Sequence, residues 1–276
     1  MSNKETSIKN TIFTNGDDIT LVRKDLDQGT WEWGVDNALK NLFQVVPFQS
    51  SQAVLRELAG SGKKVLIKPA HAGEQDHAEP VKGIDSYDYV SPNWPNATPQ
   101  GSPPLACAEG SVEGRDRTGT PLFRKGDGAD PTRLGTGAGS DVCVYFTSQD
   151  HLKELMAPGG RPDEVLLHEL VHSLRIAQGC ALCLPMPDDY DTVEEFYAIL
   201  ITNINRSECR YRTLRANHFG KTNLADTDDA RFYAKYRDTI DSVVRQMRGL
   251  CQSIAAVQCG FNPIRRALMT SGGQRR

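Results

Sequence analysis

The amino-acid sequence predicts an α+β fold, with a mixed sheet in the N-terminal half and a mainly helical C-terminal half. Short apolar and β-branched runs, typical of strands, occur at 19–22, 64–68 and 141–147. Longer stretches with apolar residues at helical spacing follow residue 160. The 276 residues suit one large domain, since domains hold roughly 100–200 residues.

The composition is that of an ordinary globular protein, with 38% hydrophobic and 24% charged residues. Its 32 Lys and Arg against 35 Asp and Glu leave a net charge of −3, which indicates neither a nucleic-acid nor a membrane partner. The sequence MSNKETSIKNTIFTNGDD at the start has no apolar core of a signal peptide, and no apolar run reaches about 18 residues. We therefore expect a soluble protein made without a signal peptide and without a membrane span.

The N-terminal half is predicted to mix strands with one helix. ITLV (19–22) and KVLIK (64–68) are strand-like, and a helix over 51–59 has Ser50 or Ser51 as its N-cap and ends at the glycines of 60–62.

A segment rich in glycine and proline follows at about 91–140. It contains nine Gly and seven Pro and almost no periodicity, which predicts a long loop or insertion. GTGAGS within it is not expected to bind phosphate, because no strand precedes it and no helix follows it at the right place.

The C-terminal half begins with a predicted strand at DVCVYFT (141–147) and a helical stretch near 149–156. A buried helix is then expected from Pro162, which suits a first helical turn, to Gly179, which suits a helix end. Two further helices are predicted at about 192–213 and 228–257. In the second of these, the apolar residues recur close to every 3.5 positions: Tyr236, Ile240, Val243, Met247, Leu250 and Ile254.

The buried helix carries His168-Glu169-Leu170-Val171-His172, the pattern HExxH. Side chains four residues apart lie on one face of a helix, so both imidazoles can bind one tetrahedral ion. Glu169 is one position away, where its carboxylate can deprotonate a metal-activated water without binding the metal. Burying two unliganded imidazoles and a carboxylate on a mostly apolar helix would be costly, which favours a metal site over a purely structural helix.

A catalytic zinc ion usually takes three protein ligands, and the segment after His172, SLRIAQG, contains no third histidine. The candidates are Glu194 and Glu195, at the start of the next predicted helix. Glu195 is preferred, because Ala198 beside it allows close approach of the HExxH helix and Thr202 continues the same face. Glu194 is then expected to contact a ligand histidine.

HExxH followed by a glutamate on the next helix resembles the gluzincin metallopeptidases. The text LLHELVHSLR…VEEFYAI is similar to the zinc proteases that bacteria inject into host cells as type III effectors, and to the clostridial neurotoxin light chains. The resemblance covers about 60 residues, from 141 to about 205. It implies a zincin-like metallopeptidase domain over 1–276, a Zn²⁺ cofactor, peptide-bond hydrolysis, and delivery into another cell by a specialised secretion system. In the light chains the second glutamate of the pair is the ligand, which supports Glu195.

A hydrolase of this kind also needs a group that stabilises the developing oxyanion. The light chains use an arginine and a tyrosine far downstream of the HExxH motif. The candidates here are Arg215 and His218 in LRANHFG, with Tyr233, Tyr236 and Arg237 as further possibilities.

These residues and the family resemblance together predict a zinc-dependent endopeptidase that cleaves a protein or peptide substrate. His168, His172 and Glu195 bind the metal, and Glu169 is the general base and then the general acid. The motif specifies the metal chemistry and not the substrate, so a zinc amidase acting on cell-wall peptide is an alternative. A non-catalytic zincin-like domain that binds a partner in its groove is another.

Overall fold

The structure is a computed structural model. It describes residues 11–16, 19–44, 49–80, 139, 141–181, 186, 190, 192–218 and 222–273. Of the segment predicted as a loop at 91–140, all but Gly139 lies outside the described residues. None of the helices in the described ranges is long and apolar enough to cross a bilayer.

A small mixed sheet is formed by residues from the N-terminal half together with one strand from the middle of the chain. Its strands are β1 (Ile12–Thr14), β2 (Val65–Lys68), β3 (His77–Pro80) and β4 (Val142–Tyr145), in the order β1-β2-β4-β3. β1, β2 and β4 are parallel, and β3 runs antiparallel to β4. The mixed sheet predicted from the sequence is therefore confirmed, including the strands expected at 64–68 and 141–147.

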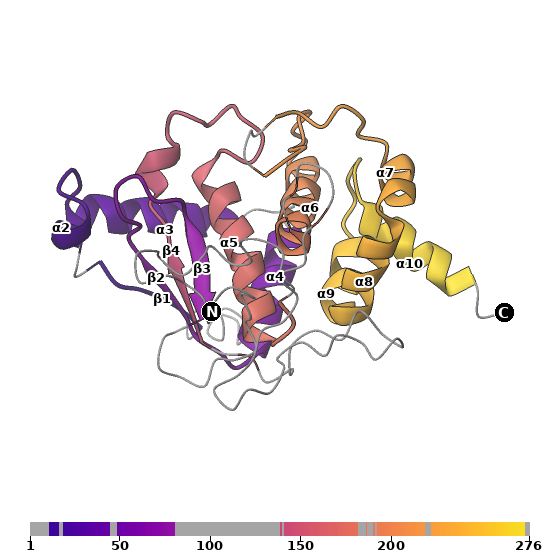
Figure 1. The fold of residues 1–276 in the computed structure, drawn as a ribbon, viewed down its shortest axis with the longest axis horizontal. Helices are drawn as coiled ribbons and strands as arrows, with labels where there is room; N and C mark the ends of the chain where they lie inside the picture. The colour runs from indigo at the N-terminus through magenta and orange to yellow at the C-terminus, as the bar shows by residue number, and fades with distance from the viewer. Residues whose placement is uncertain are drawn as a thin grey trace.

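Helices make up most of the remaining described chain. They are α2 (Ile19–Val22), α3 (Gln28–Gln44), α4 (Gln49–Gly60), the 3₁₀ helix η2 (Ser148–His151), α5 (Pro162–Ala177), α6 (Val193–Glu208), α7 (Asp229–Lys235), α8 (Arg237–Gln246), α9 (Arg248–Ala255) and α10 (Pro263–Gly273). Figure 1 shows α5 and α6 side by side, with the sheet on one side of the pair and α7 to α10 on the other.

Helix α5 is the central element of the fold, as its apolar circumference predicted. It lies against β3 and β4 on one side and against α3, α4 and α6 on the others. The helix starts at Pro162, with Glu164 reaching back to the Arg161 amide, and ends before Gly179, which has φ +62°. Nearly every residue of α5 is buried. The HExxH motif therefore lies in the interior.

Two predictions for the N-terminal half are wrong. ITLV forms a single helical turn, not a strand, because the Ile19 carbonyl accepts the Arg23 amide and a four-residue apolar run fits either structure. Ser50 and Ser51 lie inside α4 and do not cap it. The cap is the Glu208 carboxylate, which accepts the amides of Gln49 and Ser50 at 2.6 and 3.1 Å.

The stretch predicted as a helix near 149–156 is helical only over η2. It continues as successive turns, in which the Glu154 and Ala157 amides donate to carbonyls three residues back. Helix α6 ends at Glu208, short of the predicted 213, because Arg210 takes a positive φ of 63°.

The helix predicted over 228–257 is three helices, broken at Tyr236 and Met247. Both residues leave helical geometry, with φ near −113° and −120°. Each break coincides with a buried contact: the Tyr236 ring packs on Phe196, and the Met247 sulfur accepts a hydrogen bond from Arg175. The predicted apolar stripe is nevertheless buried along its whole length.

Candidate metal centre

Helix α5 aligns the two histidines of the HExxH motif. Its regular turn places the His168 and His172 Nε2 atoms 3.1 Å apart, with the rings edge to face. Both residues are 5% exposed. The spacing predicted from the sequence therefore brings the two imidazole nitrogens to one buried point.

The first turn of α6 adds a carboxylate to this point. Thr192 caps the helix by accepting the Glu195 amide, which orients the following turn. Glu195 Oε2 lies 2.9 Å from His168 Nε2, and Oε1 lies 3.4 Å from His172 Nε2. The three residues predicted as metal ligands are thus in mutual contact, although 27 positions separate His168 from Glu195.

A third imidazole, that of His218, reaches the same carboxylate. Its Nε2 lies 3.1 Å from Glu195 Oε2, and donor atoms of His168, Glu195 and His218 all lie within 4.8 Å of one another. The sequence predicted His218 near the chemistry, but as an oxyanion stabiliser. The structure places it among the candidate ligands.

The donor set fits a metal ion. A tetrahedral ion with bonds of about 2.0–2.1 Å holds its donors about 3.3 Å apart, and four of the donor pairs here lie 2.9 to 3.4 Å apart. Three imidazoles and one carboxylate are ligands that divalent transition metals prefer. The residues could therefore hold a metal ion.

The electrostatics of the cluster also favour a cation. Burial lowers the pKa of His168 to about 3, so its imidazole is neutral and its lone pair is available. Burial opposes ionisation of Glu195, but His172 and His218 hold the pKa of Glu195 well below its ordinary value. For His172 burial is likewise outweighed by Glu195, and its pKa rises to about 9. A bound metal would replace that proton.

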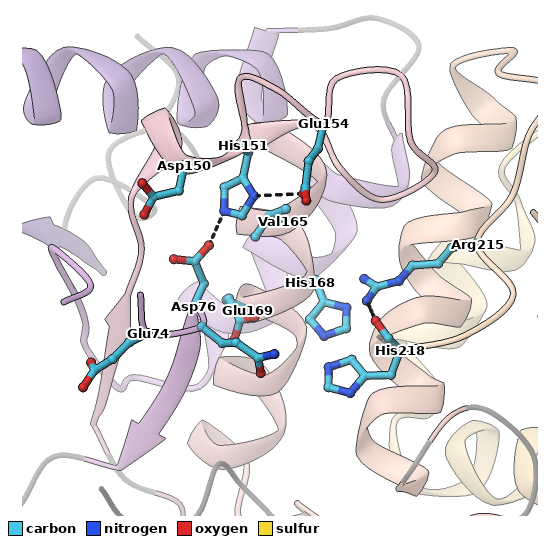
Figure 2. Close-up of a pocket in the computed structure, with 11 residues that line it drawn as sticks. Glu74, Asp76, Asp150, His151, Glu154, Val165, His168, Glu169, Arg215 and His218 are labelled. Atoms are coloured by element: carbon cyan, nitrogen blue, oxygen red, sulfur yellow. Dashed lines mark hydrogen bonds and ion pairs between the residues drawn. The ribbon is translucent and has the colours of Figure 1, made fainter. Parts of the chain in front are cut away.

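Glu169 lies beside the cluster without belonging to it. Burial raises the pKa of its carboxyl to about 8. It lines two hollows next to the candidate ligands, a larger one of about 300 Å³ and a smaller one of about 30 Å³. Figure 2 shows Glu169 on the wall of the larger hollow, across from His218. We call the larger hollow the cavity; the described residues that line it are Glu74, Gln75, Asp76, Asp150, His151, Glu154, Val165, His168, Glu169, Arg215 and His218.

Arg215 lines the cavity as well, but its side chain is engaged by its own loop. The guanidinium donates to the main-chain carbonyls of Asn217, at 2.8 Å, and His218. Burial lowers the pKa of Arg215. The role predicted for it at the oxyanion therefore stays a prediction.

The other oxyanion candidates lie elsewhere. Tyr236 packs in an aromatic cluster with Phe196 and Phe232, and Tyr233 donates to Asp241. Neither tyrosine, nor Arg237, is among the described residues that line the cavity. All three come from α7 and α8 or the junction between them, on the far side of α6 from α5 (Figure 1).

Glu194 has a different partner from the one predicted. Its carboxylate accepts hydrogen bonds from Arg175 Nε at 2.6 and 2.7 Å, and both side chains are almost fully buried. Consecutive residues of a helix point about 100° apart, so Glu194 cannot face the same way as Glu195.

The cavity also contains a histidine–carboxylate pair that was not predicted from the sequence. His151 on η2 contacts the Asp76 carboxylate, and its other nitrogen lies 3.8 Å from Glu154. The three side chains form one wall of the cavity (Figure 2). Asp76 and His151 are 75 positions apart, and no local pattern links them.

Comparisons of the chain with protein-family models, with curated proteins and with solved structures find no match. The similarity to gluzincin metallopeptidases therefore depends on the HExxH…E motif.

Proposed function

We propose that this protein is a zinc-dependent endopeptidase. One observation supports it above the others: the Nε2 atoms of His168 and His172 and the carboxylate of Glu195 lie 2.9 to 3.4 Å from one another, beside a cavity lined by Glu169. A purely structural cluster would not need a buried carboxylate on the cavity wall next to three convergent donors.

His168, His172 and Glu195 would hold the ion. When bound, Zn²⁺ polarises an amide carbonyl and makes water acidic near neutral pH. Glu169 takes the proton from the attacking water and delivers it to the leaving amine nitrogen as the C–N bond breaks. A carboxyl whose pKa lies near neutrality suits both transfers. Burial raises the pKa of Glu169 above its ordinary value, and a bound cation would lower it again toward neutrality.

The choice of a polypeptide substrate, and of a bacterial effector or toxin as the setting, follows from the motif resemblance. The cavity agrees with a substrate that enters from solvent, because it extends from the buried His168 to the exposed Glu74.

The first measurement is the metal content of the desalted protein by elemental mass spectrometry. We expect close to one zinc per chain, lost in His172→Ala. Absence of metal from the wild type, even after incubation with Zn²⁺, would overturn the proposal.

Glu169→Gln tests the chemistry separately from metal binding. The amide cannot accept a proton, so we expect zinc content to be unchanged and cleavage of unfolded casein to fall about 100- to 10,000-fold. Glu32→Gln is the matched control, because Glu32 is exposed on α3 and contacts Gln28. A Glu169→Gln protein that cleaves casein at the wild-type rate would contradict the assigned base.

The same assay separates the alternatives. Hydrolysis of purified cell wall but not of casein, lost in Glu169→Gln, would identify a cell-wall amidase. Zinc binding with no hydrolysis of either would favour a domain that binds a partner in its groove.

A further inference from the structure

The position of His218 suggests more than an oxyanion contact. Its Nε2 and that of His168 lie 3.1 and 2.9 Å from the same oxygen, Oε2 of Glu195. The two rings are nearly parallel, 3° apart, with centroids separated by 6.1 Å. His218 therefore directs its nitrogen at the candidate ligands, where a metal would lie.

A hairpin-like loop carries His218 to this position. Two hydrogen bonds close its stem. The Ala216 amide donates to the Thr222 carbonyl at 2.9 Å, and the Leu224 amide donates to the Leu214 carbonyl at 2.7 Å. These bonds join the two sides of the loop below His218. The described part of the loop is thus held as a unit.

The base of this loop is fixed to the same helix that carries Glu195. The Asn203 side chain of α6 donates to the Arg215 carbonyl at 2.8 Å and accepts the Arg215 amide at 2.7 Å. Asn203 and Arg215 are buried. Glu195 and the loop base therefore share one rigid support.

The Arg215 side chain then holds the part of the loop that bears His218. Its guanidinium binds the carbonyls of Asn217 and His218, and the contact with His218 is drawn in Figure 2. Gly159 makes room for it: a Cβ there would lie 2.8 Å from Arg215 Cδ.

We propose that His218 is a fourth protein ligand of the metal ion and that Arg215 positions it through the two carbonyls. His218 would bind the same ion as in the proposed function, and this binding does not require that the protein hydrolyse a substrate. His218 is also the most exposed donor, with 20% of its side chain accessible against 6% for His168 and His172 and 12% for Glu195. With His218 bound, the activated water would be a fifth donor, a coordination number that catalytic zinc sites can reach.

X-ray absorption of the zinc-loaded wild type tests the ligand count directly, because imidazole rings give a characteristic scattering pattern. We expect three histidines. A count of two would overturn the inference and leave the proposed function standing. A wild type that binds no zinc would overturn both.

Substitution gives an independent readout. Loss of a partner outside the coordination shell costs about 10- to 100-fold in metal affinity, so loss of a ligand should cost at least about 100-fold. We expect His218→Ala to lose this much Zn²⁺ affinity and to change the visible absorption of the Co²⁺ form. His71→Ala is the control, because His71 is exposed and is not among the described residues that line either hollow. Wild-type affinity and spectrum in a folded His218→Ala protein would overturn the inference.

Arg215→Lys tests the positioning role. Lysine keeps the charge but not the planar fork that reaches two carbonyls. The Co²⁺ spectrum should shift toward that of His218→Ala, with the fold checked by circular dichroism. An unchanged spectrum would show that Arg215 does not position His218.

Discussion

At the scale of single residues, the adjacent glutamates of α6 have separate roles. Glu195 faces the imidazoles of α5, whereas Glu194 binds Arg175, whose side chain is fully buried. The Arg175 guanidinium also donates to the Cys180 carbonyl and lies over the Tyr197 ring. The buried guanidinium is therefore surrounded by favourable partners, and removal of its carboxylate partner should lower the free energy of unfolding.

We expect substitution of Glu194 to affect stability and substitution of Glu195 to affect zinc binding. Glu194→Gln should lower the free energy of unfolding by about 3–5 kcal/mol, because it leaves the Arg175 charge buried and unpaired. Zinc affinity, measured well below the unfolding midpoint, should stay near that of the wild type. Glu195→Gln should instead lose zinc affinity, since a neutral amide is a poorer ligand than a carboxylate. Urea unfolding and zinc titration of both proteins check this, and equal loss of zinc affinity in the two would contradict the assignment.

At the scale of elements, the end of α6 caps the start of α4. The Glu208 carboxylate accepts the Gln49 and Ser50 amides and the Ser50 hydroxyl, the last at 2.6 Å. Asn205, one turn earlier, donates to the same hydroxyl. Because α4 and α6 both pack on α5, this cap helps to hold the helices around the HExxH motif.

Removal of this cap should destabilise the protein. We expect Glu208→Ala to lower the free energy of unfolding by about 2 kcal/mol, at the upper end for a helix cap, because it leaves amide groups of α4 without acceptors. Equilibrium unfolding in urea measures the change. Glu32→Ala, on the exposed face of α3, should stay within about 0.5 kcal/mol of the wild type. Equal stability of the two variants would show that the cap contributes nothing.

At the scale of the whole molecule, the candidate ligands join three segments: α5, α6 and the loop with His218. These segments meet between the sheet and the C-terminal helices (Figure 1). An ion bound to all three segments stabilises only the folded state, because the unfolded chain does not bring the ligands together.

Metal removal should therefore lower the unfolding temperature. Free zinc at 100 times its dissociation constant stabilises a protein by about 2.7 kcal/mol, and a chelator removes that contribution. We expect the wild-type midpoint to fall on chelation and that of His172→Ala to stay unchanged. Differential scanning calorimetry with and without chelator measures these midpoints. A wild-type midpoint that stays constant while its zinc is removed would contradict the coupling.

The sequence by itself determined the features that depend on local spacing. HExxH on a helix aligns His168 and His172 because residues four apart share a face, and the apolar circumference of that helix buries it at the centre. The same reasoning located Glu195 on the following helix.

Tertiary structure decided the features that depend on distant partners. Glu208 caps a helix 159 positions away, His151 meets Asp76, and a loop held by Asn203 brings His218 to Glu195. The breaks at Tyr236 and Met247 likewise coincide with contacts to other helices. Periodicity describes only the face that a residue presents within its own element. Which side chain it meets there depends on how the elements pack.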